Sequence, residues 1–231
     1  MERKRFEQKE DELKSDVKCI VLIGRPGSGK DTQGGKIAKL IPNSFVISTG
    51  DIVRGLQDPE SEFSKTYPEF IERLNKEKEE SNKGGLVSDE LILNIVDKII
   101  AEKTKEGIKT FIFTGFPRTE VQLEEFDKKF DNVTYIELKV SRSVSEERAN
   151  NRKAEADALG KPHRPDDDKV ETRNDTYDSK TQKMVDVLKS QNRIVEIIGT
   201  QSIDDVTDSI VEALPEIFAN KDIVTRDGQI I

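Results

Sequence analysis

Residues 24–32 read Gly24-Arg25-Pro26-Gly27-Ser28-Gly29-Lys30-Asp31-Thr32, or GRPGSGKDT, and this stretch decides the fold. It follows the short apolar run Lys18–Ile23 and precedes residues 33–40, whose pattern predicts a helix. In a glycine-rich turn between a strand and a helix, backbone N–H groups and the helix N-terminus face an anion, and Lys30 adds a full positive charge. The stretch therefore predicts a phosphate-binding loop.

The loop departs from the general pattern G-x-x-x-x-G-K-[ST] at one position. That pattern places a hydroxyl for Mg²⁺ directly after the lysine. Here Asp31 occupies the position, and the hydroxyl comes one residue later, at Thr32. The negatively charged Asp31 side chain thus lies where a negatively charged polyphosphate is expected to bind. The role of this carboxylate is therefore a question that the function has to answer.

Composition restricts the class of protein. The 231 residues are 33% hydrophobic and 36% charged, which suits one core with small inserted lobes, and the net charge of −8 argues against a general nucleic-acid binder. The single cysteine, Cys19, lies in an apolar run and is interpreted as a core residue, so neither a disulfide nor a cysteine-based zinc site is expected. No apolar run reaches a membrane-spanning length of about 18 residues. The charged N-terminus contains no secretory signal, so we expect a cytoplasmic location.

Five apolar runs predict the strands of one sheet. Helical patterns separate them, and the clearest is the stripe formed by Leu91, Ile92, Ile95, Val96, Ile99 and Ile100. Alternating strands and helices indicate an α/β fold with a parallel sheet between helical layers, and ligands bind at the carboxyl ends of such strands. The predicted strands are Lys18–Ile23, 45–47, 110–113, 133–138 and 194–198.

Two stretches interrupt this alternation. Residues 55–85 are polar and charged around a predicted helix over 69–78, and residues 153–168 (KAEADALGKPHRPDDD) lack apolar periodicity. Both are interpreted as surface insertions or mobile lobes.

Further motifs follow the loop in a fixed order. They are STGDIVR (48–54), GLVSDEL (85–91), GFPRT (115–119) with Gln122, the pair Arg148 and Arg152, RPDD (164–167) followed by Arg173, Tyr177 and Thr181, and GTQSIDDV (199–206). In this order and spacing, residues 17–214 resemble the adenylate kinases of the nucleoside monophosphate kinase family.

The resemblance implies a three-layer P-loop NTPase core with a five-stranded parallel sheet, a nucleoside-monophosphate-binding (NMP-binding) lobe and a short lid. It implies Mg²⁺-dependent phosphoryl transfer from ATP to AMP that gives two ADP. The expected parts are a charged tail (1–16), the core (17–48, 86–148 and 169–214), the NMP-binding lobe (49–85), the lid (149–168) and a C-terminal extension (215–231). The chain is expected to act as a monomer on nucleotides, without a nucleic-acid or membrane partner.

The resemblance also assigns site residues. The expected catalytic residues are Lys30, Arg118, Arg152, Arg164 and Arg173. The expected ATP-binding residues are Gly27, Ser28, Gly29, Lys30, Asp31, Thr32, Arg148 and Gln201. The expected AMP-binding residues are Thr49, Gly50, Arg54, Val87, Gly115, Arg118 and Gln122.

The number of arginines also has a physical reason that does not depend on the resemblance. Transfer of a phosphoryl group between two nucleotides brings several negatively charged phosphates together. Fixed guanidinium groups offset the repulsion between these phosphates, and each can bind two phosphate oxygens at once. Arg142 and Arg193 match no motif and are interpreted as solvated charges.

The acceptor base can be argued from one side chain. The Gln122 amide can form hydrogen bonds with two atoms of an adenine edge, which favours AMP over UMP or CMP as the acceptor.

Two substitutions depart from the family pattern. The family usually has Gly at position 31 and an Asp that holds a Mg²⁺-bound water at position 114, where this chain has Thr114. We hypothesise that Asp31 takes over this Mg²⁺-side role, since Mg²⁺ typically uses one or two carboxylates with phosphates and waters. The alternative is that Asp31 faces solvent as a favourable acid in the first helical turn. The lid has no cysteines, so no structural zinc is expected, and His163 is interpreted as solvent-exposed.

Two rival functions remain open at this point. One is a kinase of the same fold for CMP, UMP or GMP, for which the long segment after Arg54 and the substitution at Thr114 leave room. The other is a catalytically quiet nucleotide-binding regulatory module.

Overall fold

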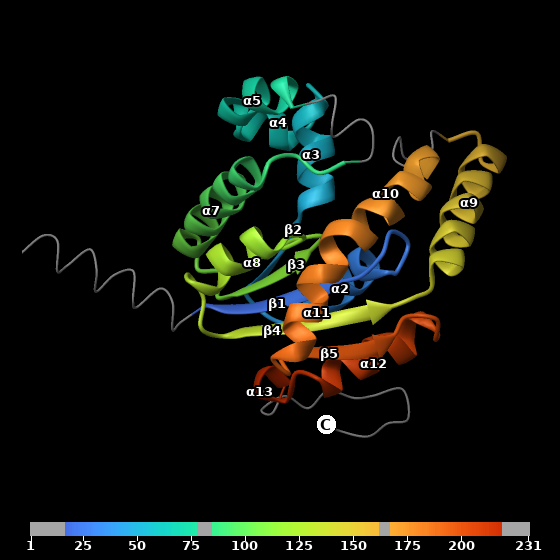
Figure 1. Ribbon diagram of the computed structural model, residues 1–231. Helices are drawn as coiled ribbons and strands as arrows, with labels where there is room; N and C mark the ends of the chain where they lie inside the picture. The colour runs from blue at the N-terminus through green and yellow to red at the C-terminus, as the bar shows by residue number, and fades with distance from the viewer. Residues whose placement is uncertain (1–16, 78–84, 162–166, 219–231) are drawn as a thin grey trace, which may run out of the picture.

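Five parallel strands form one sheet at the centre of the molecule (Figure 1). The computed structural model describes residues 17–77, 85–161 and 167–218. The spatial order is β2-β3-β1-β4-β5, with Leu22 of β1 opposite Thr114 of β3. The strands are β1 (Lys18–Ile23), β2 (Ser44–Ser48), β3 (Thr110–Thr114), β4 (Val133–Lys139) and β5 (Ile194–Ile198). The predicted α/β fold with a five-stranded parallel sheet is confirmed.

Helices cover both faces of the sheet because its central strands are apolar on both sides. One face, with Val21 and Phe113, packs on α7 (Asp89–Lys105), α8 (Glu120–Asp127) and α11 (Gln182–Ser190). The opposite face, with Ile20 and Ile112, packs on α2 (Lys30–Leu40) and α12 (Ile203–Glu212). The predicted stripe on α7 is buried throughout. Cys19 is 2% exposed and belongs to the core, as predicted.

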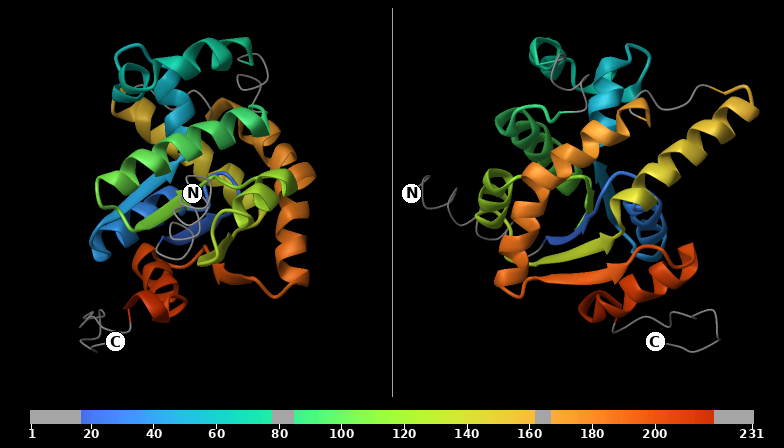
Figure 2. Two further views of the ribbon diagram at one scale, coloured as in Figure 1. Left: turned by 90° about the vertical axis from the view of Figure 1, so that its left-hand side faces the viewer. Right: turned by 45° about the vertical axis from the view of Figure 1, so that its right-hand side comes forward.

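The predicted NMP-binding lobe stands beyond the carboxyl ends of the strands (Figures 1 and 2). It contains α3 (Thr49–Gln57), α4 (Glu62–Thr66), the 3₁₀ turn η1 (Pro68–Phe70) and α5 (Ile71–Lys76). Helix α3 begins directly after β2, and Ser48 caps it by accepting a hydrogen bond of 3.3 Å from the Asp51 N–H. The lobe is therefore fixed to the sheet at the edge where ligands are expected.

The second predicted insertion is partly helical. Helix α9 (Arg142–Ala158) continues through residues 153–158, which the sequence analysis placed in a surface lobe. Lys, Glu and Ala are strong helix formers, and a helix exposed on most sides shows no apolar period. Helix α9 is followed by the 3₁₀ turn η2 (Asp167–Lys169), α10 (Val170–Thr176) and the π-helical turn η3 (Tyr177–Thr181). His163 and Arg164 lie outside the described residues.

A short helix, α13 (Pro215–Phe218), follows α12. Phe218 is 2% exposed and packs in the same apolar cluster as Ile210. The packed structure thus continues four residues beyond position 214. Within the described ranges, no helix combines the length and the apolar composition that crossing a membrane would require.

Candidate active site

The predicted phosphate-binding loop adopts a conformation that depends on glycine. Gly27 (φ +71°) and Gly29 (φ +96°) lie in the left-handed region, and Gly29 occupies the N-cap of α2. A Cβ on Gly27 would lie 3.2 Å from the Ser145 carbonyl oxygen, so the loop also lies close to α9. The loop therefore leads from β1 into the N-terminus of α2, as expected for an anion site.

Lys30 begins α2 and directs its ammonium back over the loop. Its Nζ donates a hydrogen bond of 3.0 Å to the Arg25 carbonyl. Desolvation lowers the pKa of Lys30 to about 7, helped by the charges of Arg118, Arg173 and Arg152 and opposed by Asp31. Several cations thus share one region, which favours a ligand with several negative charges.

A cavity of about 490 Å³ lies at the carboxyl ends of the strands. Lys30 and Arg173 line it together with every residue predicted to bind the acceptor, namely Thr49, Gly50, Arg54, Val87, Gly115, Arg118 and Gln122. Val53 and Gln57 also line the cavity, and neither was predicted to be a site residue. Their four-residue spacing from Thr49 along α3 is the signal that could have identified them.

Two arginines face this cavity from different elements. Arg118 Nε donates to the Gly115 carbonyl at 2.6 Å, and Gly115 (φ +77°) leaves room for the guanidinium, because a Cβ there would lie 2.5 Å from Arg118 Nη2. Arg54 of α3 forms an ion pair with Asp51 one turn earlier. Both guanidinium groups are therefore held by neighbours before any ligand binds.

Three of the predicted acceptor residues that line the cavity are uncharged. Thr49 donates a hydrogen bond of 2.6 Å to the Gly115 carbonyl, and Val87 is 7% exposed. Gln122 is 2% exposed, and its Oε1 accepts a hydrogen bond of 2.7 Å from the Arg118 N–H. These side chains offer apolar contacts and one fixed amide, a combination that suits a nucleobase.

The predicted donor residues gather around the loop. Arg148 joins two loops, because Nη1 donates to the Gly27 carbonyl at 3.1 Å and Nη2 to the Gly199 carbonyl at 2.8 Å. Asp31, Thr32 and Gln201 are exposed and do not line the cavity.

Arg152 and Arg173 have different surroundings in this structure. Arg152 of α9 pairs with Asp167, whose side chain is buried, through a 3.0 Å hydrogen bond from Nε to Oδ2 and a second contact from Nη2. Arg173 of α10 lines the cavity. The structure therefore brings Arg173 to the predicted acceptor residues and leaves Arg152 at the base of the lid.

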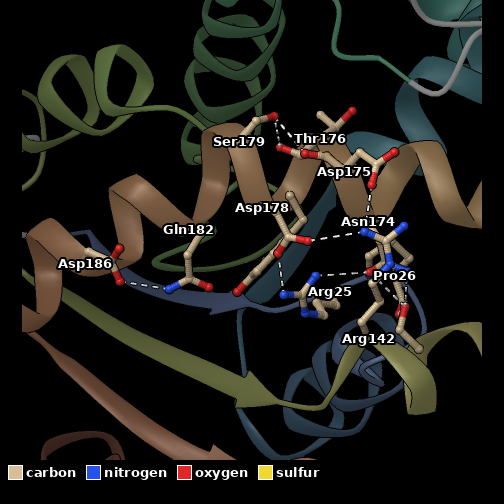
Figure 3. A network of polar contacts seen from close by, with 12 residues as sticks. Arg25, Pro26, Arg142, Asn174, Asp175, Thr176, Asp178, Ser179, Gln182 and Asp186 are labelled. Atoms are coloured by element: carbon tan, nitrogen blue, oxygen red, sulfur yellow. Dashed lines mark hydrogen bonds and ion pairs between the residues drawn. The ribbon is translucent and has the colours of Figure 1, made fainter.

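Arg25 ties the loop to the π-helical turn (Figure 3). Its guanidinium lies 4.7 Å from the Tyr177 ring centroid, pairs with Asp178 and donates to Asn174 Oδ1 at 3.4 Å. Ser145 completes the link by donating to the Pro26 carbonyl at 2.6 Å. Arg25 was not predicted to be a site residue, because no spacing within the loop indicates partners about 150 residues away.

Oxygen ligands for a divalent cation are few near the loop. Among residues 17–77, 85–161 and 167–218, no group of three or more His, Cys, Asp or Glu side chains could hold a metal. Asp31 and Thr32 are exposed hard oxygen donors in the first turn of α2, while Thr114 is 1% exposed and its Oγ1 makes no hydrogen bond. Asp31 and Thr32 therefore fit a Mg²⁺ ion whose remaining ligands are phosphates and waters.

Comparisons with known proteins agree with this geometry. The family model described as adenylate kinase matches residues 22–193. An adenylate kinase of Caldicellulosiruptor bescii is 33% identical over 226 residues, with 84% of this chain and 98% of the relative covered. An adenylate kinase of Azorhizobium caulinodans is 34% identical over 207 residues, with 84% of this chain and 98% of the relative covered. An adenylate kinase of Xanthobacter autotrophicus is 34% identical over 209 residues, with 85% of this chain and 98% of the relative covered. This chain therefore belongs to the adenylate kinase family.

Proposed function

We propose that the protein catalyses reversible phosphoryl transfer from ATP to AMP, giving two ADP. The observation that carries this proposal is one cavity of about 490 Å³. Its lining includes the loop lysine, Lys30, three arginines and the uncharged acceptor residues Thr49, Val87 and Gln122; the arginines are Arg54, Arg118 and Arg173. A binding module for one nucleotide would not need this many cations beside a second base pocket. Membership of the family supports the same activity.

Positioning and charge account for the proposed catalysis. Lys30 and the loop amides would hold the donor phosphates, and Arg54 and Arg118 the acceptor phosphate. Arg173, Arg152 and Arg164 would offset the charge that the transferring group spreads over its oxygens. The lid would exclude water, which is a competing acceptor. No covalent intermediate is required.

Magnesium would come with ATP. Asp31 and Thr32 are the residues of this chain that would face it, directly or through water. When bound, Mg²⁺ would neutralise part of the phosphate charge. Asp31 follows Lys30 directly and its charge acts on the Lys30 ammonium, which supports the proposal that it replaces the acid missing at position 114.

AMP is the proposed acceptor. Thr49, Val87 and Gln122 line the cavity together with Arg118. The monomeric state expected from the sequence stays a prediction. The cytoplasmic location expected from the sequence stays a prediction.

A panel of acceptors in an ADP-release assay tests the proposal. With MgATP, we expect rapid ADP release with AMP and rates at least about tenfold lower with CMP, UMP and GMP. The rates should fall to background with EDTA. Faster turnover of another monophosphate would overturn the acceptor assignment. Tight binding of ATP and AMP without turnover would instead indicate a regulatory module.

A further inference from the structure

We infer that Asp89 is a positioning residue that fixes the orientation of the Gln122 amide and so selects 6-amino over 6-oxo purine monophosphates. The inference rests on the proposed function, since it concerns the residues of the same cavity that are proposed to bind the base. It assigns a role to a side chain that lies behind the residues expected to touch the acceptor.

The contacts that carry this inference converge on one amide. Asp89 is the first residue of α7, and its Oδ1 accepts hydrogen bonds from Gln122 Nε2 at 2.8 Å and from Thr119 Oγ1 at 2.9 Å. On the other side, Gln122 Oε1 accepts a hydrogen bond of 2.7 Å from the Arg118 N–H. The amide is therefore held between one acceptor and one donor.

These two neighbours allow only one orientation of the amide. An ionised carboxylate only accepts hydrogen bonds, and a backbone N–H only donates. After a flip, Oε1 would face the Asp89 carboxylate and the NH₂ group would face the Arg118 N–H. Both hydrogen bonds would be lost at a side chain that is 2% exposed, and buried groups without partners are costly.

The fixed amide still has one acceptor and one donor to offer. Oε1 keeps a second lone pair and Nε2 a second hydrogen, and Gln122 lines the cavity. The adenine edge presents an amino group that donates and N1 that accepts, which matches this pair. Hypoxanthine has a similar shape but presents a carbonyl oxygen and an N1–H, which is the reversed pattern. A flipped amide could accept this reversed pattern, but the fixed amide cannot.

Inosine monophosphate (IMP) is therefore the competitor that tests the inference. Steady-state kinetics with MgATP would give kcat/KM for AMP and for IMP, and the readout is their ratio. Asp89→Ala removes the acceptor that opposes the flip. We expect the AMP-to-IMP ratio to fall by about 5- to 100-fold, which is the range set by one two-atom base contact.

Two further variants separate positioning from folding. Asp89→Asn keeps an oxygen that can accept both hydrogen bonds, but its NH₂ group can also donate to a flipped amide, so we expect a ratio between those of the wild type and Asp89→Ala. Ser88→Ala removes the N-cap of α7, whose Oγ accepts from the Leu91 N–H at 3.3 Å, without touching Gln122. We expect it to lower stability and leave the ratio within about twofold of wild type. If Asp89→Ala does not fold, Asp89→Ser replaces it, because serine suits a helix start and its hydroxyl is too short to reach Gln122.

Some outcomes would overturn the inference. One is a folded Asp89→Ala or Asp89→Ser protein with an unchanged ratio. Another is an equal fall in kcat/KM for both acceptors, which would indicate a purely structural role. If the wild type does not phosphorylate AMP, the proposed function fails, and the ratio of the AMP and IMP dissociation constants by calorimetry then tests Asp89 independently of turnover.

Discussion

Lys30 and Arg25 are joined within the loop by a hydrogen bond of 3.0 Å from the Lys30 ammonium to the Arg25 carbonyl. Burial of this ammonium, helped by the charges of Arg118, Arg173 and Arg152, lowers its pKa to about 7. The lysine is therefore only partly protonated at neutral pH until an anion binds. Phosphate favours the charged form and should raise this pKa again.

ATP binding should consequently take up protons near pH 7.5. Titration calorimetry in buffers with different ionisation enthalpies measures the number of protons bound per ATP. The wild type should take up a clear fraction of a proton more than Lys30→Met, which serves as the control for protons bound by ATP itself. Equal uptake by the two proteins would show that Lys30 is already charged in the free protein.

Lys30→Met should raise thermal stability, and more so at pH 6 than at pH 10. The folded pKa of about 7 lies below the ordinary value of 10.5, so the unfolded chain binds more protons between these pH values. The wild type therefore gains stability from this group as the pH rises through that window, and Lys30→Met does not. We expect its Tm advantage below pH 7 to be about 2–6 °C and to shrink toward pH 10. Calorimetric Tm values of both proteins at the two pH values check this, and an advantage independent of pH would contradict it.

Arg118→Ala should lower kcat by about 10²- to 10⁴-fold with MgATP and AMP, because it removes a fixed positive charge beside the acceptor phosphate. Arg193→Ala is the matched control. Arg193 pairs with Asp127 at 2.7–2.8 Å and stacks on Tyr135, away from the cavity. Its removal should leave kcat within about twofold. Activity near wild type in Arg118→Ala would show that the acceptor phosphate binds elsewhere.

Local sequence patterns predicted the strands and the loop well. Each strand lies within two residues of its predicted bounds, because buried parallel strands read as continuous apolar runs. The residues predicted to bind the acceptor line one cavity, since several of them follow strands whose carboxyl ends meet at one edge of the sheet. Membership of a known family supplied the roles of these residues, which apolar patterns alone could not.

Contacts between distant segments could not be predicted in this way. The links of Asp89 to Gln122 and of Arg25 to Asp178 join residues 33 and 153 positions apart, and neither has a local pattern. The end of α9 was missed because an exposed helix shows no apolar period. Helix α13 was missed because its only strong signal is one buried phenylalanine, Phe218.

Asp31→Gly should raise the Mg²⁺ concentration needed for half-maximal rate by about 5- to 30-fold if the carboxylate supports the metal, which corresponds to roughly 1–2 kcal/mol. Titrating Mg²⁺ against rate at fixed total ATP measures this. Glu212→Gln, an exposed change at the end of α12, controls for net charge. A Mg²⁺ requirement unchanged by Asp31→Gly would assign Asp31 to solvent.

Gly34→Ala should destabilise the protein although alanine is the better helix former by about 1 kcal/mol. A Cβ at Gly34 would lie 2.8 Å from Thr114 Cγ2, and overpacking of this kind costs about 1–3 kcal/mol. Thr114→Ser removes the opposing methyl group, so the double variant should recover most of the loss in chemical denaturation.

The neighbouring glycine provides the control. A Cβ at Gly35 would meet nothing within 4 Å, so Gly35→Ala should stabilise the same helix by up to about 1 kcal/mol. A Gly34→Ala protein as stable as Gly35→Ala would show that α2 can move away from the sheet without cost.

The π-helical turn Tyr177–Thr181 sets the rotational phase between α10 and α11. In an α-helix each residue advances the side chains by about 100°, and a π-helical turn accommodates one residue more than an α-helical one. The extra residue lets Arg173 face the cavity while α11 keeps its apolar side on the core. Deleting Ser179, an exposed residue, would therefore rotate one half of the helix against the other. Either Arg173 would then no longer face the cavity, or Met184, Val185 and Leu188 of α11 would no longer be buried in the core.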